Sequence, residues 1–276
     1  MTWTWRPDVV VALALLALAY GAGWARLARR SPARRRPALL ARLALALAGV
    51  GALAVALLGL HEAAHASFSA HMAQHLLVLV IGVPAILLAD PLAAVLWALP
   101  ARARHAAGRA LTAGTPLRRT WRALTAMPVA WSIHALVLWL WHVPAAYDAA
   151  LASGWLHDLE HLAFAGAATL FWWPVIRPAP RTRPVPHPGW TVAYLLLGAF
   201  QSAALGLWLA RAPRALYGYT SAGALEDQAW GGVLMWGAGG AVDMLAVLLV
   251  VYRVLSLGER ATTARLLDAP HPVSEN

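Results

Sequence analysis

The chain consists mainly of long apolar segments separated by short polar and basic stretches. Seven such segments are present, at about residues 8–27, 38–60, 71–97, 127–142, 157–176, 190–210 and 230–255. Several reach the ~20 residues that a helix needs to cross the ~30 Å hydrocarbon core of a bilayer. The pattern predicts an all-α, polytopic membrane protein, a bundle of seven transmembrane helices that forms a single membrane domain over residues 1–276.

The 22 basic residues are all arginines, and most of them lie in alternate loops. All but Arg6, Arg211 and Arg214 flank the loops after the first, third and fifth segments or the stretch after the seventh. Loops rich in positive charge stay in the cytoplasm, so we expect the N-terminus outside and the C-terminus in the cytoplasm. No basic stretch precedes the first segment, which is therefore expected to remain as an anchor rather than to be a cleaved signal peptide.

Two polar stretches fall on the predicted cytoplasmic side. The long loop 100–126 contains a stretch at about 117–124 that we expect to form an amphipathic helix on the membrane surface. The proline-rich stretch 174–188 is expected to be a stiff, exposed connector.

Composition supports the membrane class and excludes several kinds of chemistry. Hydrophobic residues make up 61% of the chain and charged residues 12%, a balance unlike that of soluble domains. The net charge of +10 would suggest nucleic acid in a soluble protein, but topology explains it here, so we expect contact with membrane lipids and none with nucleic acid. The chain has no cysteine, so any bound metal requires histidine, carboxylate or methionine ligands.

Histidines are concentrated on one side of the predicted bundle. Of the eleven, seven map to the outer ends of the second to fifth segments: His61, His65, His71, His75, His142, His157 and His161. His134 lies about 12 Å deeper than His142, at 1.5 Å per helical residue. The other three, His105, His187 and His271, fall in predicted loops or the tail, and we expect no role for them.

Two histidine pairs have the spacing of a shared ligand site. His71 and His75 are four residues apart at the start of the third segment, as are His157 and His161 at the start of the fifth. On a helix this spacing puts two imidazoles on one face, about 5–6 Å apart at Cβ, so both can reach one ion. His142 would add a ligand from a third helix.

Further candidate ligands surround these five histidines: His61, His65, Glu160, Met72 and His134. Glu160 would either bind the metal or accept a hydrogen bond that fixes an imidazole tautomer. His134 would act as a relay, unless it is an interior histidine with an interhelical hydrogen bond.

Two five-residue strings match zinc hydrolase motifs. Residues 61–65 read HEAAH and residues 157–161 read HDLEH, the inverted form. A membrane zinc metallohydrolase is therefore one alternative. Imidazole suits zinc, copper and iron, whereas thioether neighbours favour copper(I), so copper is the expected metal and zinc the alternative. Histidines on facing helices could also hold a haem iron axially, which leaves a haem-binding redox protein as another alternative.

Four groups of residues occur in a specific order between about residues 60 and 250. They are FSAHMAQHLL at 68–77, WHVP at 141–144 with Tyr147 and Ala150-Leu151, LHDLEH at 156–161 running to FWWP at 171–174, and Asp227-Gln228 with Gly231-Gly232 and LMW at 234–236. Together they resemble the CtaG-type cytochrome c oxidase assembly factors, a family of bacterial integral membrane proteins.

The resemblance implies a seven-helix protein of the bacterial cytoplasmic membrane that helps to assemble a haem–copper oxidase by serving its copper centre. It implies a non-enzymatic metallochaperone whose partners are haem–copper oxidase subunits. Metal binding is implied for five histidines: His71, His75, His142, His157 and His161.

Overall fold

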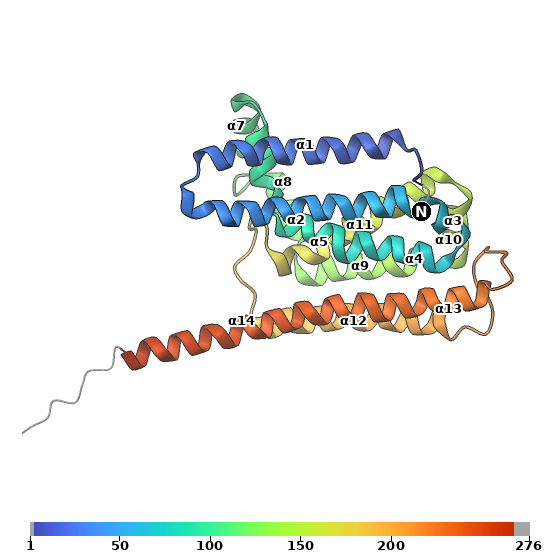
Figure 1. The fold of residues 1–276 in the computed structure, drawn as a ribbon. Coiled ribbons are helices and arrows are strands. Elements are labelled where there is room, and N and C mark those ends of the chain that lie inside the picture. Colours follow the sequence, from blue (N-terminus) through green and yellow to red (C-terminus); the bar gives the residue numbers. More distant parts are fainter. Residues whose placement is uncertain (1–2, 268–276) are drawn as a thin grey trace, which may run out of the picture.

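A computed structural model describes the backbone of residues 3–267 and the side chains of residues 3–256. All regular structure within these residues is helical (Figure 1). The α-helices are α1 Pro7–Arg30, α2 Arg36–Ala54, α3 His61–Ala66, α4 Phe68–Leu76, α5 Val83–Leu88, α6 Pro91–Ala98, α7 Ala101–Ala110, α8 Pro116–Leu124, α9 Met127–Trp141, α10 Pro144–Ala152, α11 Gly154–Ile176, α12 Pro188–Ala210, α13 Ala224–Leu234 and α14 Gly240–Leu267.

Four short segments with different hydrogen-bond spacing continue these helices. A 3-10 turn, η1 (Ala33–Arg35), precedes α2. There are three π-helical segments: η2 (Val55–Gly59) ends the helix that begins with α2, whereas η3 (Leu77–Gly82) lies between α4 and α5 and η4 (Met235–Gly239) between α13 and α14.

The helices confirm an all-helical membrane protein. Six stretches are long and apolar enough to span a bilayer: Pro7–Arg30, Ala33–Gly59, Phe68–Leu88, Gly154–Ile176, Pro188–Ala210 and Ala224–Ser256. α8 and α9 together satisfy the same test, but they are bent by 67° at the break between them. The structure therefore contains six candidate spans, or seven with this bent pair.

The prediction of one helix over residues 71–97 is wrong. The helix ends at Leu88, Asp90 has a left-handed backbone with φ 53°, and α6 then begins at Pro91 as a separate helix against α1. A residue before proline is disfavoured in the α conformation, so the Asp90-Pro91 step interrupts a stretch that is apolar on both sides. Arg42 Nη1 lies 3.4 Å from Asp90 Oδ2 at this break.

The other predicted segments coincide with helices. The largest difference is at the last, where α13, η4 and α14 form a single helical stretch. The stretch predicted to be an amphipathic helix is α8. The connector predicted from residue 174 begins only at Arg177, because α11 continues through Pro174 to Ile176.

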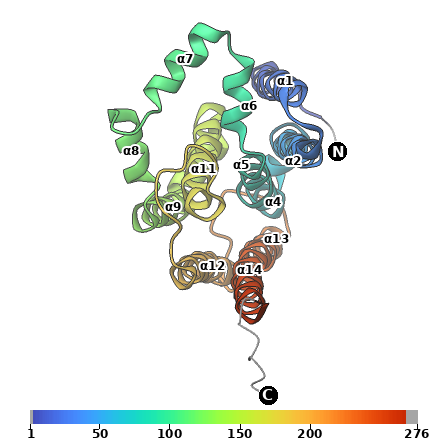
Figure 2. The same cartoon turned by 90° about the vertical axis from the view of Figure 1, so that its left-hand side faces the viewer.

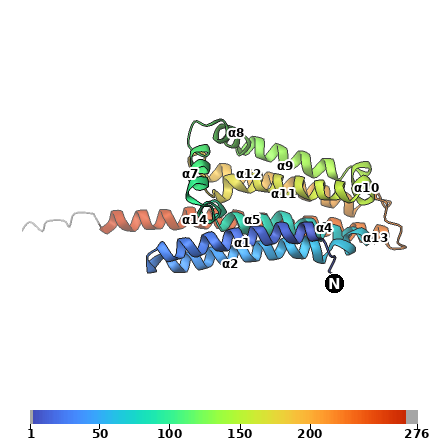
Figure 3. The same cartoon turned by 90° about the horizontal axis from the view of Figure 1, so that it is seen from above.

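α11 lies at the centre of the bundle, between the α4–α5 helix and α9 (Figure 2). α1 and α2 pack together on one side, α12 and α14 on the other, and α13 packs against both α4 and α12. The N-terminus, α3, α10 and the starts of α4 and α13 lie at one end of the bundle (Figure 3). α7, α8 and the end of α14 lie at the opposite end, which is also where the arginine-rich loops are found (Figure 1).

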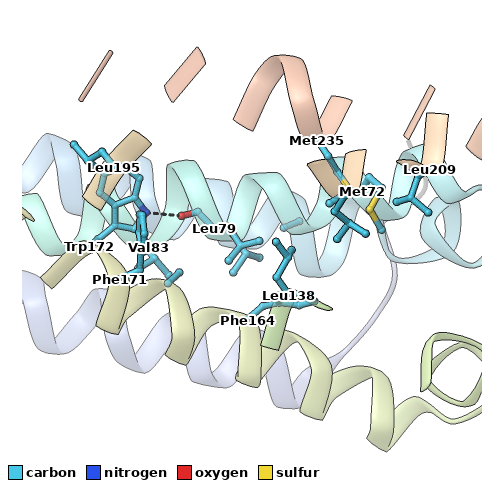
Figure 4. Packing of buried hydrophobic residues seen from close by; sticks show 14 of the residues in the cluster. Met72, Leu79, Val83, Leu138, Phe164, Phe171, Trp172, Leu195, Leu209 and Met235 are labelled. Carbon is cyan, nitrogen blue, oxygen red and sulfur yellow. Dashed lines mark hydrogen bonds between the residues drawn. The ribbon is translucent and has the colours of Figure 1, made fainter. Parts of the chain in front are cut away.

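Apolar side chains fill the space between α4, α11, α9, α12 and η4 (Figure 4). Phe164, Phe171 and Leu138 are among the buried residues, and Trp172 Nε1 donates to the Leu79 carbonyl at 3.1 Å. Close packing by shape is the main force that holds helices together in lipid. This core therefore holds α4 and α11, the helices that carry the two histidine pairs, at a defined separation.

Candidate metal centre

α4 carries His71 and His75, and its first turn is held from another helix. Asp227 of α13 accepts a hydrogen bond from the Phe68 backbone N–H at 2.6 Å and another from Ser67 Oγ at 2.9 Å. These bonds satisfy N–H groups that a helix start leaves unpaired, and they place a negative charge at the positive end of the helix dipole. Asp227 thus fixes the start of the helix that carries both histidines.

His71, His75 and Glu160, the inner group, are buried together. The Nε2 atoms of His71 and His75 lie 3.0 Å apart. Glu160 Oε2 is 3.5 Å from His71 Nε2, and Glu160 Oε1 is 3.7 Å from His75 Nε2. Neither carboxylate oxygen accepts a hydrogen bond within the described residues. Such a buried carboxylate needs a cation or a proton for balance, and a metal ion between it and the two imidazoles would supply that balance.

The hydrogen-bond network assigns the tautomer of His71. Tyr219 Oη donates to the Ala64 carbonyl at 2.8 Å, so it must accept from Tyr147 Oη, 2.9 Å away. Tyr147 Oη in turn accepts from His71 Nδ1 at 2.8 Å. Each of these hydrogen bonds then has one hydrogen, so the Nε2 atom of His71 carries a lone pair and accepts from His75 Nε2, 3.0 Å away, with Glu160 beside it.

Burial keeps Tyr147 and Tyr219 neutral, so that each hydroxyl retains the hydrogen that it donates in this series of hydrogen bonds. It raises the pKa of Tyr147 well above the ordinary value, with a further contribution from the neighbouring Tyr219. Burial is also the main cause that raises the pKa of Tyr219. Tyr219 lies in the connection between α12 and α13, and no sequence motif predicts a role for it. Tyr147 of α10 is indicated only by the family resemblance.

His142 and His161 have the same tautomer for a simpler reason. His142 Nδ1 lies 2.7 Å from the Leu138 carbonyl, and His161 Nδ1 lies 2.8 Å from the His157 carbonyl. A carbonyl can only accept, so Nδ1 carries the hydrogen in both rings and Nε2 has a free lone pair. Both Nε2 atoms are buried and without a hydrogen-bond partner within the described residues. A backbone acceptor on the outer ring nitrogen is the usual arrangement of metal-binding histidines.

These two histidines lie beside the inner group rather than within it. The ring of His161 is 5.2 Å from that of His75 and 6.3 Å from that of His71, measured between centroids. His142 lines a cavity together with His75. The five histidines of the predicted site are therefore neighbours, while the tightest set also includes Glu160.

His61, His65 and His157, the outer group, lie next to the inner group. Their ring centroids are 4.9 Å apart for His61 and His65, 4.9 Å for His65 and His157, and 5.6 Å for His61 and His157. His65 is exposed, His61 is half-buried and His157 is buried. Burial, and to a smaller extent the nearby His65, lowers the pKa of His61, which favours the neutral ring that binds metals.

The two hydrolase-like strings have their carboxylates in different surroundings. Glu62 of HEAAH is exposed and accepts from Thr4 Oγ1 at 3.4 Å. Glu160 of HDLEH belongs to the inner group and is fully buried. Only Glu160 therefore faces the imidazoles of the inner group.

A cavity of about 50 Å³ extends from the inner group into the bundle. His134, Met72 and Asp243 line it, together with His75 and His142. The His134 ring packs on Phe171, with 4.6 Å between centroids. His134 and the Met72 thioether thus border the space below the inner group, and neither belongs to the inner or the outer group.

Tyr147→Phe is expected to weaken metal binding at His71 by about 10–100-fold, the usual effect of losing an outer hydrogen bond to a ligating histidine. The loss would leave His71 Nδ1 without its 2.8 Å partner, so that the ring is less well oriented. Titration of the purified protein with Cu⁺ or Zn²⁺ against a competing chelator would measure the change.

Tyr217→Phe is the matched control, because Tyr217 Oη donates to the His142 backbone carbonyl and not to an imidazole. Equal affinities for the Tyr147 and Tyr217 variants would contradict the assigned role of the tyrosine chain.

Comparison with known proteins adds one finding to this geometry. The family model described as cytochrome c oxidase caa3 assembly factor matches residues 18–256, which include both histidine groups and all the candidate spans except residues 7–17 of α1. Comparison with curated proteins and with solved structures gives no match.

Proposed function

Since this chain belongs to the cytochrome c oxidase caa3 assembly factor family, we propose that it binds copper at the inner group and delivers it to a subunit of the oxidase. His142, His157 and His161 would complete the set of ligands around His71, His75 and Glu160. Copper is then the cargo of the protein, and the oxidase is its destination.

The observation that carries the proposal is the orientation of the imidazole lone pairs. The Nε2 atoms of His142 and His161 have no hydrogen-bond partner within the described residues, because backbone carbonyls hold the hydrogen on Nδ1. His71 Nε2 also carries a lone pair, and its hydrogen-bond partner is His75 Nε2, 3.0 Å away. A set of buried histidines that served only to pack helices would be expected to use both ring nitrogens in hydrogen bonds.

Two observations favour copper over zinc and haem: the types of ligand atom present and the small volume of the cavity. Imidazole sites bind copper more tightly than the other divalent first-row ions, and Met72 beside the cavity adds a thioether that suits copper(I). The cavity of about 50 Å³ is far below the ~300–1,000 Å³ of pockets for larger organic ligands, which argues against haem.

A non-enzymatic role is favoured over hydrolysis by the position of Glu160. A hydrolase needs a carboxylate beside a metal-bound water, with an open position that faces the substrate. The Glu160 side chain is only 1% exposed and lies against two imidazoles, as a metal ligand would. Glu62, the carboxylate of the other string, is in solvent.

We further propose that the histidine end of the bundle faces the outside of the bacterial cytoplasmic membrane. The N-terminus and both histidine groups lie at that end, and the arginine-rich loops lie at the other (Figure 1). With the positive loops in the cytoplasm, copper would bind on the outer side. This orientation requires that the bent α8–α9 pair serve as the seventh span.

The proposal predicts that a strain lacking this protein makes a caa3-type oxidase deficient in copper. Metal analysis of the purified oxidase should give substantially less copper per haem than in the parent strain, and a plasmid copy of the chain should restore it. Purified full-length protein should itself contain copper by elemental analysis and no Soret band in its visible spectrum. Normal oxidase copper in the deletion strain, or zinc in place of copper in the protein, would contradict the proposal.

A further inference from the structure

We propose that the outer group, His61, His65 and His157, is a second metal site that takes up copper from solution and passes it to the inner group through His157. The inference rests on the proposed function, because the outer group would be the route by which copper reaches the inner group. Its ligand is a copper ion held by three imidazoles.

The three imidazoles of the outer group lie close enough together to bind one metal ion. One nitrogen of each ring lies within 4.8 Å of the others. His61 and His65 are four residues apart on α3, so their rings lie on one face of that short helix, and His157 approaches from α11. The exposed His65 leaves one side open to water, so an incoming donor could exchange ligands there.

His157 gives a second, independent indication. Its ring is 1% exposed, and both ring nitrogens lack a hydrogen-bond partner within the described part of the chain. A neutral imidazole with two unsatisfied nitrogens is costly to bury, and a metal ion would satisfy one of them. His157 therefore needs a ligand more than the half-buried His61 or the exposed His65 does.

The position of His157 also connects the two groups. Its ring centroid is 4.9 Å from that of His65 in the outer group and 5.0 Å from that of His71 in the inner group. An ion held by the outer group could replace His65 by His71 while His157 stays bound. Transfer would proceed by exchange of one imidazole at a time, with no change of oxidation state required.

The N-terminal segment holds the helices of the outer group together. Arg6 forms two hydrogen bonds with Asp158, the neighbour of His157, at 2.7 and 2.8 Å. Thr4 N donates to the Leu58 carbonyl at 3.0 Å, just before α3. Arg6 and Asp158 are thus positioning residues that keep α11 beside α3.

Copper stoichiometry and exchange rate together test the two-site arrangement. Full-length protein in detergent should bind two copper ions, whereas His61→Ala/His65→Ala should bind one and should release it to an external chelator at least tenfold more slowly. His105→Ala, an exposed histidine on α7, should behave as the unchanged protein. Circular dichroism and size-exclusion chromatography would establish that each variant is folded.

Each other outcome has a definite meaning. One copper in the unchanged protein, with the same release rate in His61→Ala/His65→Ala, overturns the outer site and leaves the proposed function intact. Loss of all copper in that folded variant overturns the separation into two sites. No copper in the unchanged protein overturns both proposals. Arg6→Gln should retain both ions but slow their exchange, and an unchanged rate would remove the positioning role of Arg6.

Discussion

Replacement of both His71 and His75 by alanine is expected to abolish tight copper binding at the inner group, so that the purified protein retains only the ion of the outer group. Loss of a residue that only orients a ligand costs about 10–100-fold in metal affinity, so loss of two direct ligands should cost more than ~100-fold. The remaining Glu160 would face an empty space in place of two imidazoles 3.5 and 3.7 Å away. In cells, the oxidase should then contain as little copper as in the deletion strain.

Two controls keep this result interpretable. His105→Ala changes a histidine that is remote from both groups and should retain full copper binding. Addition of Glu160→Gln to the double alanine variant removes the buried negative charge, which would otherwise favour unfolding once its partners are gone. If the folded triple variant binds as many copper ions as the unchanged protein, the inner group is not a copper site.

Gly232→Ala is expected to destabilise the packing of α12 against α13 by about 1–3 kcal/mol, the typical cost of an atom added to a well-packed core. A Cβ at Gly232 would lie 2.4 Å from the Gly206 carbonyl oxygen and 2.7 Å from the Ala210 backbone nitrogen. Both are main-chain atoms, so the helices would have to separate. A lower melting temperature in detergent would measure the effect.

Gly237→Ala provides the matched control in the same long helix. A Cβ at Gly237 meets nothing within 4 Å, and alanine is the better helix former by roughly 0.5–1 kcal/mol, so this variant should be at least as stable as the parent. If both variants melt at the same temperature, close approach at Gly232 contributes little to the fold.

Much of the fold could be predicted, because a helix that crosses a bilayer needs about 20 mainly apolar residues and such stretches are visible in the sequence. The break at Asp90 was missed because hydrophobic residues continue beyond it in α6, and a window of hydropathy does not register the backbone restriction before Pro91.

The candidate site could be predicted only in part. The four-residue spacing of His71 with His75 and of His157 with His161 places each pair on one helical face, and the packing of α4 near α11 brings the faces together. Spacing along the chain does not determine which atoms come closest between helices. The inclusion of Glu160 in the inner group, and the support of His71 by Tyr147 and Tyr219, both depend on contacts between distant segments. The metal-binding role of these residues stays a prediction.

The π-helical segment η3 separates the histidine-bearing α4 from α5 on the same span. A π turn holds about one residue more than an α turn, and one residue corresponds to a rotation of about 100° around the helix axis. Because η3 takes up this extra residue within its own turns, loss of one codon there would convert the π turn to an α turn and leave the two halves of the span facing as before. Descendants of one ancestral gene could differ by a codon there and still hold the same metal in the same place.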